Sequence, residues 1–191
     1  MKQQISLALL CACLISNAEA GSQSRIAHYA VAGKTAHDIY EIIKTTAPRV
    51  AANATFAFTV PATRTIVKHT RTKGSCKYAA IKTSAFYIFH LPKHIQPETM
   101  SKTTRAKWQD FVEYLETHEQ GHATSWNACF ASYDQQGLTL KAKTCEQLDK
   151  NLENLFTKIK RNCLVLDEKM DFHFRKEVQS TPFLSEALRK P

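Results

Sequence analysis

The sequence predicts an α+β fold, with a small antiparallel sheet packed against a long antiparallel pair of helices. Segments with the two-residue alternation of strands dominate the first half of the chain, and segments with the three- and four-residue apolar spacing of helices dominate the second half. Strands that precede helices, rather than alternating with them, are typical of α+β domains. No Gly/Ser-rich linker divides the chain, so residues 21–191 are expected to form one domain.

The first strand-rich segments are separated by clear stop and start signals. Residues 25–32 alternate as a strand, and Gly33 ends it. Thr35 then caps a predicted helix over residues 36–46, because a threonine oxygen can accept a hydrogen bond from the first turn.

A hairpin is predicted next. Residues 55–60 and 65–69 are extended, with Pro61 at a bulge or a sheet edge because proline cannot donate to a strand ladder. Arg71-Thr72-Lys73-Gly74 forms the turn, and residues 77–91 return as one or two strands. A loop is expected to follow, with two histidines and two prolines: His90, Pro92, His94 and Pro97.

Two long helices complete the prediction, over residues 103–135 and 145–175. Beyond about residue 180 we expect a flexible tail. Each helix has apolar side chains at three- and four-residue steps. The first helix carries Trp108, Phe111, Val112, Leu115, His118, His122 and Trp126, and the second carries Leu148, Leu152, Leu155, Phe156 and Ile159.

The first 20 residues have the pattern of a secretory signal peptide. Lys2 precedes an apolar run over residues 5–15 that is too short to span a bilayer, and Ala18-Glu19-Ala20 forms a cleavage site. We therefore expect an exported protein, periplasmic or secreted, without stable membrane insertion. The formal net charge is +9, but the basic residues are scattered, so we expect no nucleic-acid partner.

His118-Glu119-Gln120-Gly121-His122 is the pattern that points to chemistry. His118 and His122 lie one helical turn apart on one face, so both imidazoles can bind one zinc ion. Glu119 is then placed as the general base of a zinc hydrolase. Gly121 gives another element close access, and Glu116 or Asp110 is a candidate to orient a ligand histidine.

A catalytic zinc site needs a third protein ligand. Ser125 and Ala128 stand where an extended metalloprotease motif would place Gly and His, so the third ligand is expected from the second long helix. The candidates there are Glu146, Asp149, Glu153, Asp167, Asp171 and His173.

Four cysteines follow the signal peptide, and an even number in an exported chain predicts two disulfides. Cys145 and Cys163 are about 27 Å apart on one helix, too far to pair. If Cys129 bonds Cys145, position 120 faces Glu153 or Asn154. If Cys129 bonds Cys163, position 120 faces Phe172, next to His173, and Cys76 bonds Cys145.

Several of these features together resemble the bacterial family named domain of unknown function 922, which is described as predicted secreted zinc-dependent proteases. The resemblance runs from Ile26 to His173. It is carried by Gly74-Ser75-Cys76, Trp108-x-x-Phe111, the motif at residues 118–122 and a lone Cys145 at a helix start.

The family pattern downstream resembles Tyr-Asp-x-x-Thr-x-His-Gly. Here Asp167 and His173 fit it with one extra residue between them, whereas the Tyr, Thr and Gly are absent. The resemblance implies His173 as the third zinc ligand, and with it the pairs Cys76–Cys145 and Cys129–Cys163.

The expected function is that of a Zn²⁺-dependent hydrolase, a peptidase acting on a protein or peptide substrate, with Glu119 as general base. The alternative is a non-enzymatic cell-envelope binding protein with a structural or vestigial metal site, because a motif does not establish activity.

Overall fold

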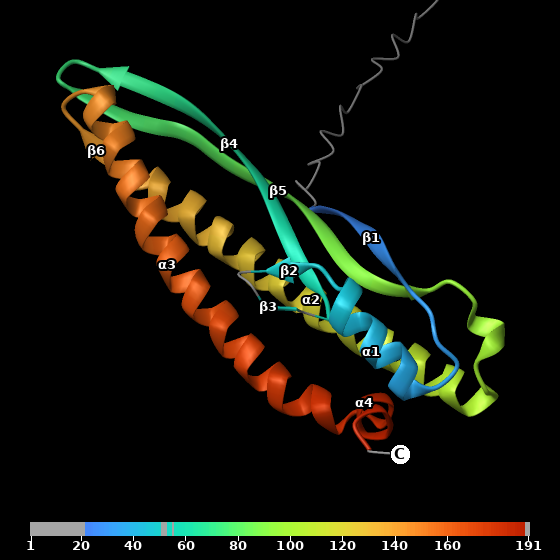
Figure 1. Cartoon of the computed structure of the whole chain (residues 1–191). Coiled ribbons are helices and arrows are strands. Elements are labelled where there is room, and N and C mark those ends of the chain that lie inside the picture. The colour runs from blue at the N-terminus through green and yellow to red at the C-terminus, as the bar shows by residue number, and fades with distance from the viewer. Residues whose placement is uncertain (1–21, 51–52, 55, 190–191) are drawn as a thin grey trace, which may run out of the picture.

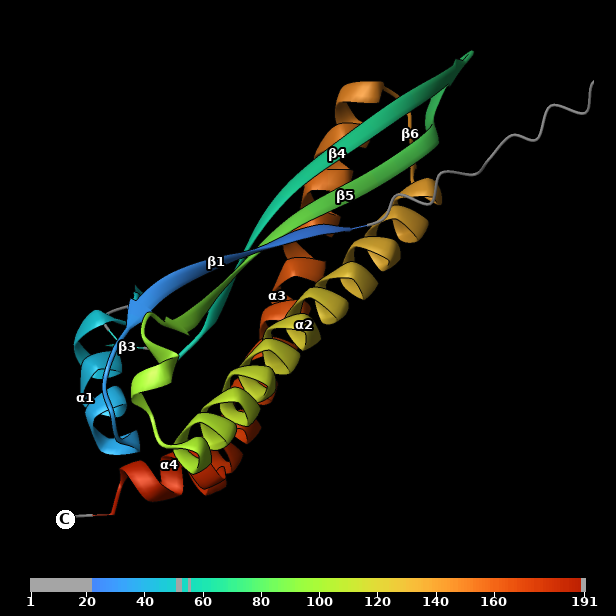
Figure 2. The ribbon, with the colours of Figure 1, turned by 90° about the vertical axis from the view of Figure 1, so that its right-hand side faces the viewer.

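The computed structural model describes residues 22–50, 53–54 and 56–189; the predicted signal peptide and its cleavage site lie outside them. The predicted α+β class is confirmed. A twisted sheet forms one layer and two long antiparallel helices form the other (Figure 1, Figure 2). The sheet contains β1 (Gln23–Val31), β4 (Phe58–Thr72), β5 (Ser75–His94) and β6 (Lys141–Ala142), and the long helices are α2 (Lys102–Leu138) and α3 (Cys145–Glu177).

The sheet is mixed, so the prediction of a wholly antiparallel sheet was wrong. β4 and β5 form the predicted antiparallel hairpin, which turns at Gly74 with a φ of 77°. β1, however, pairs with the other edge of β5 and runs parallel to it. The alternation of side chains identifies a strand but not its partner. The chain between β1 and β5, which includes α1 and β4, is long enough for β5 to return beside β1 in the parallel direction. Pro61 lies on β4, an edge strand, as expected.

β5 is longer than predicted, and this corrects the loop assigned to His90 and His94. The strand continues through Pro92, which pairs with Tyr29 of the parallel neighbour β1. His90 stacks on Phe58 with ring centroids 4.1 Å apart. His94 is buried, and its Nε2 lies 2.8 Å from the Gly33 carbonyl oxygen. A proline had suggested a break, but it is accommodated within the paired strand.

Short helices close one end of the two layers (Figure 1). α1 (Ala36–Thr46) begins with the predicted Thr35 cap, whose hydroxyl accepts from the Asp38 N–H at 3.2 Å. The expected flexible tail is instead ordered as α4 (Pro182–Ala187), because Phe183 and Leu184 are fully buried there. The remaining short elements are β2 (Arg49–Val50), β3 (Asn53–Ala54) and the 3₁₀ turns η1 (Pro97–Thr99) and η2 (Val178–Ser180).

α2 forms the centre of the core, whereas much of α3 is thinly packed. The side chains of Trp108, Phe111 and Leu115 on α2 are buried against the sheet, α1 and α4. On α3 the predicted apolar residues Leu148, Leu152 and Ile159 are buried, whereas Leu155 and Phe156 are half-buried. Over residues 160–177 the only buried residue is Cys163. That stretch is therefore held to α2 by few apolar contacts.

Both disulfides pair as the resemblance implied. Cys76 at the start of β5 bonds Cys145 at the start of α3, and Cys129 on α2 bonds Cys163 on α3. The second bond links the C-terminal third of α2 to the middle of α3. Among the described residues, no helix has a stretch both long and apolar enough to cross a bilayer.

Candidate metal centre

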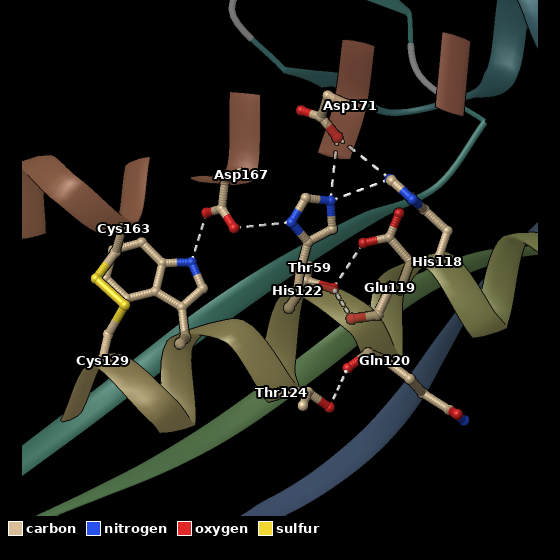
Figure 3. A network of polar contacts seen from close by, with 11 residues as sticks. Thr59, His118, Glu119, Gln120, His122, Thr124, Cys129, Cys163, Asp167 and Asp171 are labelled. Atoms are coloured by element: carbon tan, nitrogen blue, oxygen red, sulfur yellow. Dashed lines mark hydrogen bonds and ion pairs between the residues drawn. A yellow bond between two sulfur atoms is a disulfide. The ribbon is translucent and has the colours of Figure 1, made fainter. Parts of the chain in front are cut away.

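Three side chains from the two long helices converge on one point (Figure 3). His118 and His122 project from α2, and their Nε2 atoms lie 3.0 Å apart. Asp171 of α3 places Oδ1 3.0 Å from the His122 Nε2 and 3.2 Å from the His118 Nε2. The three donor atoms thus form a nearly equilateral triangle.

This triangle fits a metal ion. Ligands at about 2.0–2.1 Å from a tetrahedral zinc ion lie roughly 3.3 Å from one another, which is close to the three separations here. Two imidazole nitrogens and one carboxylate oxygen are also a donor set that zinc accepts. His118, His122 and Asp171 are therefore a group that can hold a metal ion. Three protein ligands is the number that catalytic zinc sites commonly use, whereas structural zinc sites commonly use four.

Asp167 fixes the orientation of His122. Its Oδ1 lies 3.0 Å from the His122 Nδ1, so a proton on Nδ1 is held by the carboxylate and the Nε2 lone pair is left for a ligand. The indole Nε1 of Trp126 donates to the other oxygen, Oδ2, at 2.6 Å. This chain from indole to carboxylate to imidazole is the arrangement that commonly supports metal-binding histidines.

The expected orienting carboxylate was therefore placed on the wrong helix. Glu116 accepts from the Gln120 amide at 3.2 Å, and no ligand histidine contacts it among the described residues. Asp110 is exposed on α2. The signal that could have found Asp167 is its spacing from Asp171: the two carboxylates lie one turn apart, like the two histidines that they face.

His173 is not part of the cluster, and Asp171 occupies the position expected for it. A step of two residues turns a helix by about 200°, so His173 lies on the opposite face of α3 from Asp171 and is exposed. The helix register expected from the Cys129–Cys163 bond is correct to within one residue, since Phe174 stacks on His118 and Met170 lies against Gly121. It placed the right turn of α3 opposite the motif, but it did not say which residue of that turn points inward.

His118 and Glu119 are held by packing and by one hydrogen bond from the sheet. The His118 ring stacks on Phe174 of α3, with centroids 3.9 Å apart. Glu119 is only 3% exposed, and its Oε2 accepts from the Thr59 hydroxyl of β4 at 2.6 Å. Figure 3 shows the Glu119 carboxylate beside the two imidazoles. Burial raises the pKa of this carboxyl, with the bond from Thr59 acting in the opposite direction.

The electrostatics of the cluster are dominated by its paired charges. Burial would lower the pKa of His122, but the hydrogen bonds to Asp167 and Asp171 outweigh it and raise the pKa to about 10. Burial acts to raise the pKa of Asp171, yet the bonds from His118 and His122 bring it well below its usual range. In the metal-free protein His122 is therefore protonated on both ring nitrogens and pairs with the carboxylates, and a metal ion would have to displace the proton from Nε2.

Gly121 lies against α3. A Cβ built there would lie 2.9 Å from the terminal methyl carbon of Met170. Because that methyl ends a flexible side chain that can shift, this contact alone does not require a glycine at the position.

A cleft of about 940 Å³ opens beside the cluster. His118, Glu119 and His122 lie on its α2 side, and β4 contributes Phe58, Thr59 and Pro61. α3 supplies the wall that carries Asp167 and Asp171. The residues that can hold a metal ion and the Glu119 carboxylate therefore border the same cleft.

Comparison with known proteins finds one family. Residues 26–172 match the family described as "Bacterial protein of unknown function (DUF922)". No curated protein and no solved structure was found to match the chain.

Proposed function

This chain belongs to the bacterial family of unknown function DUF922, and from that premise we propose that it is a zinc-dependent hydrolase that cleaves peptide bonds. The observation that carries the proposal is the convergence of two imidazoles and a carboxylate at the edge of a cleft, with a second, buried carboxylate beside them.

A zinc ion at this site would supply Lewis acidity, which polarises a scissile carbonyl and acidifies water. The chain's own residues supply the remaining groups. His118, His122 and Asp171 hold the cation, and Asp167 keeps the His122 ring turned toward it. The stacking of Phe174 on His118 limits rotation of the other imidazole.

Glu119 is the proposed general base. It takes a proton from the attacking water and delivers it to the leaving amine. A raised pKa suits this role, because a base works best when its pKa is near the working pH. The Thr59 hydroxyl occupies Oε2 and so orients the carboxylate.

The two disulfides support a place of action in an oxidising compartment, since such bonds persist mainly in exported proteins. We propose that the protein works in the periplasm or outside the cell, on a protein or peptide substrate.

The test is the variant Glu119→Gln, compared with wild type for zinc content and for cleavage of a casein-type protein substrate. The amide keeps the shape but cannot accept the proton, so zinc content should stay near one ion per chain while the rate falls at least 100-fold. Glu116→Gln, on the same helix but outside the cleft, is the matched control and should retain activity. Equal turnover of Glu119→Gln and wild type would remove Glu119 from the mechanism.

A further inference from the structure

One end of the cleft is an apolar chamber. From the metal-binding residues it extends toward α1 and α4, and its walls come from four separate parts of the chain. The chamber is lined by Tyr40, Phe56, Phe174, Val178, Leu184 and Leu188.

The chamber is built by the fold rather than left by loose packing. Val178 and Leu184 are buried in the core, and Tyr40 and Phe56 are in aromatic contact with centroids 6.3 Å apart. Phe174 reaches the metal cluster directly through its stack on His118. An apolar group placed in the chamber therefore lies next to the reacting position.

The polar groups near the cluster already have partners inside the protein. Asp167 accepts from Trp126 and His122, and Glu119 accepts from Thr59. Arg175 and Gln179 also line the cleft and are the polar side chains that remain for the ligand's polar groups. The six apolar and aromatic residues of the chamber select by size, since an apolar pocket discriminates by the side chain that it removes from water.

The other wall of the cleft is an edge strand. Within the described residues, β4 pairs with β5 on one side and with no strand on the other. Its residues Phe58, Thr59 and Pro61 border the cleft. An extended peptide laid beside β4 can form backbone hydrogen bonds with such an edge, and its alternate side chains then point toward α2 and the chamber.

We propose that the cleft binds an extended peptide segment whose bulky apolar side chain, aromatic or branched aliphatic, occupies the chamber beside the bond presented to the metal cluster. The inference rests on the proposed function for the identity of the reaction, but the binding preference is a separate property.

The probes are acetylated and amidated hexapeptides in an Ala/Ser background. Phe, Leu, Ala, Lys or Glu is placed at each position in turn. Binding is measured by calorimetry with the full chain, both metal-free and zinc-loaded, and cleavage is measured with the zinc-loaded protein. One position should prefer Phe or Leu over Ala by at least about tenfold, the usual scale for discrimination by an apolar pocket.

Leu188→Lys changes the chamber at its rim, where Leu188 is 48% exposed, so folding should be unaffected. The variant should lose most of the preference for Phe and bind the Glu peptide more tightly than wild type does. Leu138→Lys, at a residue 43% exposed at the far end of α2, is the matched control and should keep the wild-type preference. Melting temperatures of both variants check that each is folded.

The outcomes separate the two proposals. Selective binding of the Phe peptide without cleavage by the zinc-loaded protein would overturn the hydrolase and leave the chamber intact. Cleavage without a preference at any position, or a preference that Leu188→Lys leaves unchanged, would overturn the chamber and leave the hydrolase intact.

Discussion

Replacing Asp171 by Asn tests which residue of α3 completes the metal centre. The carboxylate lies 3.0 and 3.2 Å from the two imidazole Nε2 atoms, whereas His173 is exposed on the other face of the helix. Loss of a residue that only orients a ligand weakens metal binding about 10–100-fold, so loss of the ligand itself should cost about 100-fold or more. His173→Asn should leave zinc affinity unchanged.

The effect on stability follows from mass action. At a free zinc concentration of about 100 times the wild-type Kd, the ion stabilises the folded state by about 2.7 kcal/mol. A 100-fold weaker Asp171→Asn variant would gain only about 0.4 kcal/mol at the same concentration. In a domain of this size about 1 kcal/mol shifts Tm by roughly 2–4 °C. Zinc should therefore raise the wild-type Tm by about 5–11 °C and that of Asp171→Asn by about 1–2 °C.

The assay is a thermal melt of chelator-stripped protein with and without buffered zinc, together with competition against a chromophoric chelator. His173→Asn provides the control, because it removes a histidine from the same turn of α3 without touching the cluster. If His173→Asn lost the zinc-induced shift while Asp171→Asn kept it, the register of α3 on α2 and the ligand assignment would both be wrong.

Three further predictions concern the carboxylate that orients His122, the disulfide between the two long helices, and a partly buried hydrogen bond between β5 and α3. Asp167→Asn should weaken zinc binding about 10–100-fold in a chelator competition while leaving one ion per chain at saturation. Replacing Cys129 and Cys163 by Ala should lower stability by about 3–4 kcal/mol, the chain-entropy value for a separation of 34 residues, and denaturant unfolding measures it. The Tyr78 hydroxyl bonds Asp149 at 2.6 Å and, with His69, lowers the pKa of that carboxyl. A carboxyl whose pKa is lowered in the folded state stabilises the fold at pH values above its ordinary pKa near 3.8. This stabilisation is lost as the pH falls through the folded-state pKa. Asp149→Asn should thus melt below wild type at pH 7 and together with it near pH 2.

The sequence was sufficient for the long helices, the first helix and the β4–β5 hairpin, and for two of the three residues of the candidate metal site. Periodicity over one uninterrupted helix places His118 and His122 together whatever packs against them, because their spacing is local. The third residue depends on how two helices cross. The disulfide placed the right turn of α3 opposite the motif, as the stack of Phe174 on His118 shows. Which residue of that turn points inward depends on the rotation of α3 about its axis, and it is Asp171 rather than His173.

Other features escaped prediction for a similar reason. The partner of β1 is decided by tertiary packing, and the helix at Pro182–Ala187 is too short for a periodic signal but is held by Phe183 and Leu184 in the core. Asp167 looked like one acidic residue among several on a charged helix face, and only the approach of Trp126 and His122 distinguishes it.

The thin packing of α3 has a kinetic consequence. Between residues 160 and 177, Cys163 is the only buried residue, so detaching this stretch exposes little apolar surface and leaves the core around α2 intact. Such a segment opens with a smaller free energy than global unfolding requires. In the proposed zinc-bound protein, exchange of the cation would then proceed through local opening of α3 between the Cys129–Cys163 bond and the buried Val178, on a timescale set by that motion rather than by denaturation of the whole molecule.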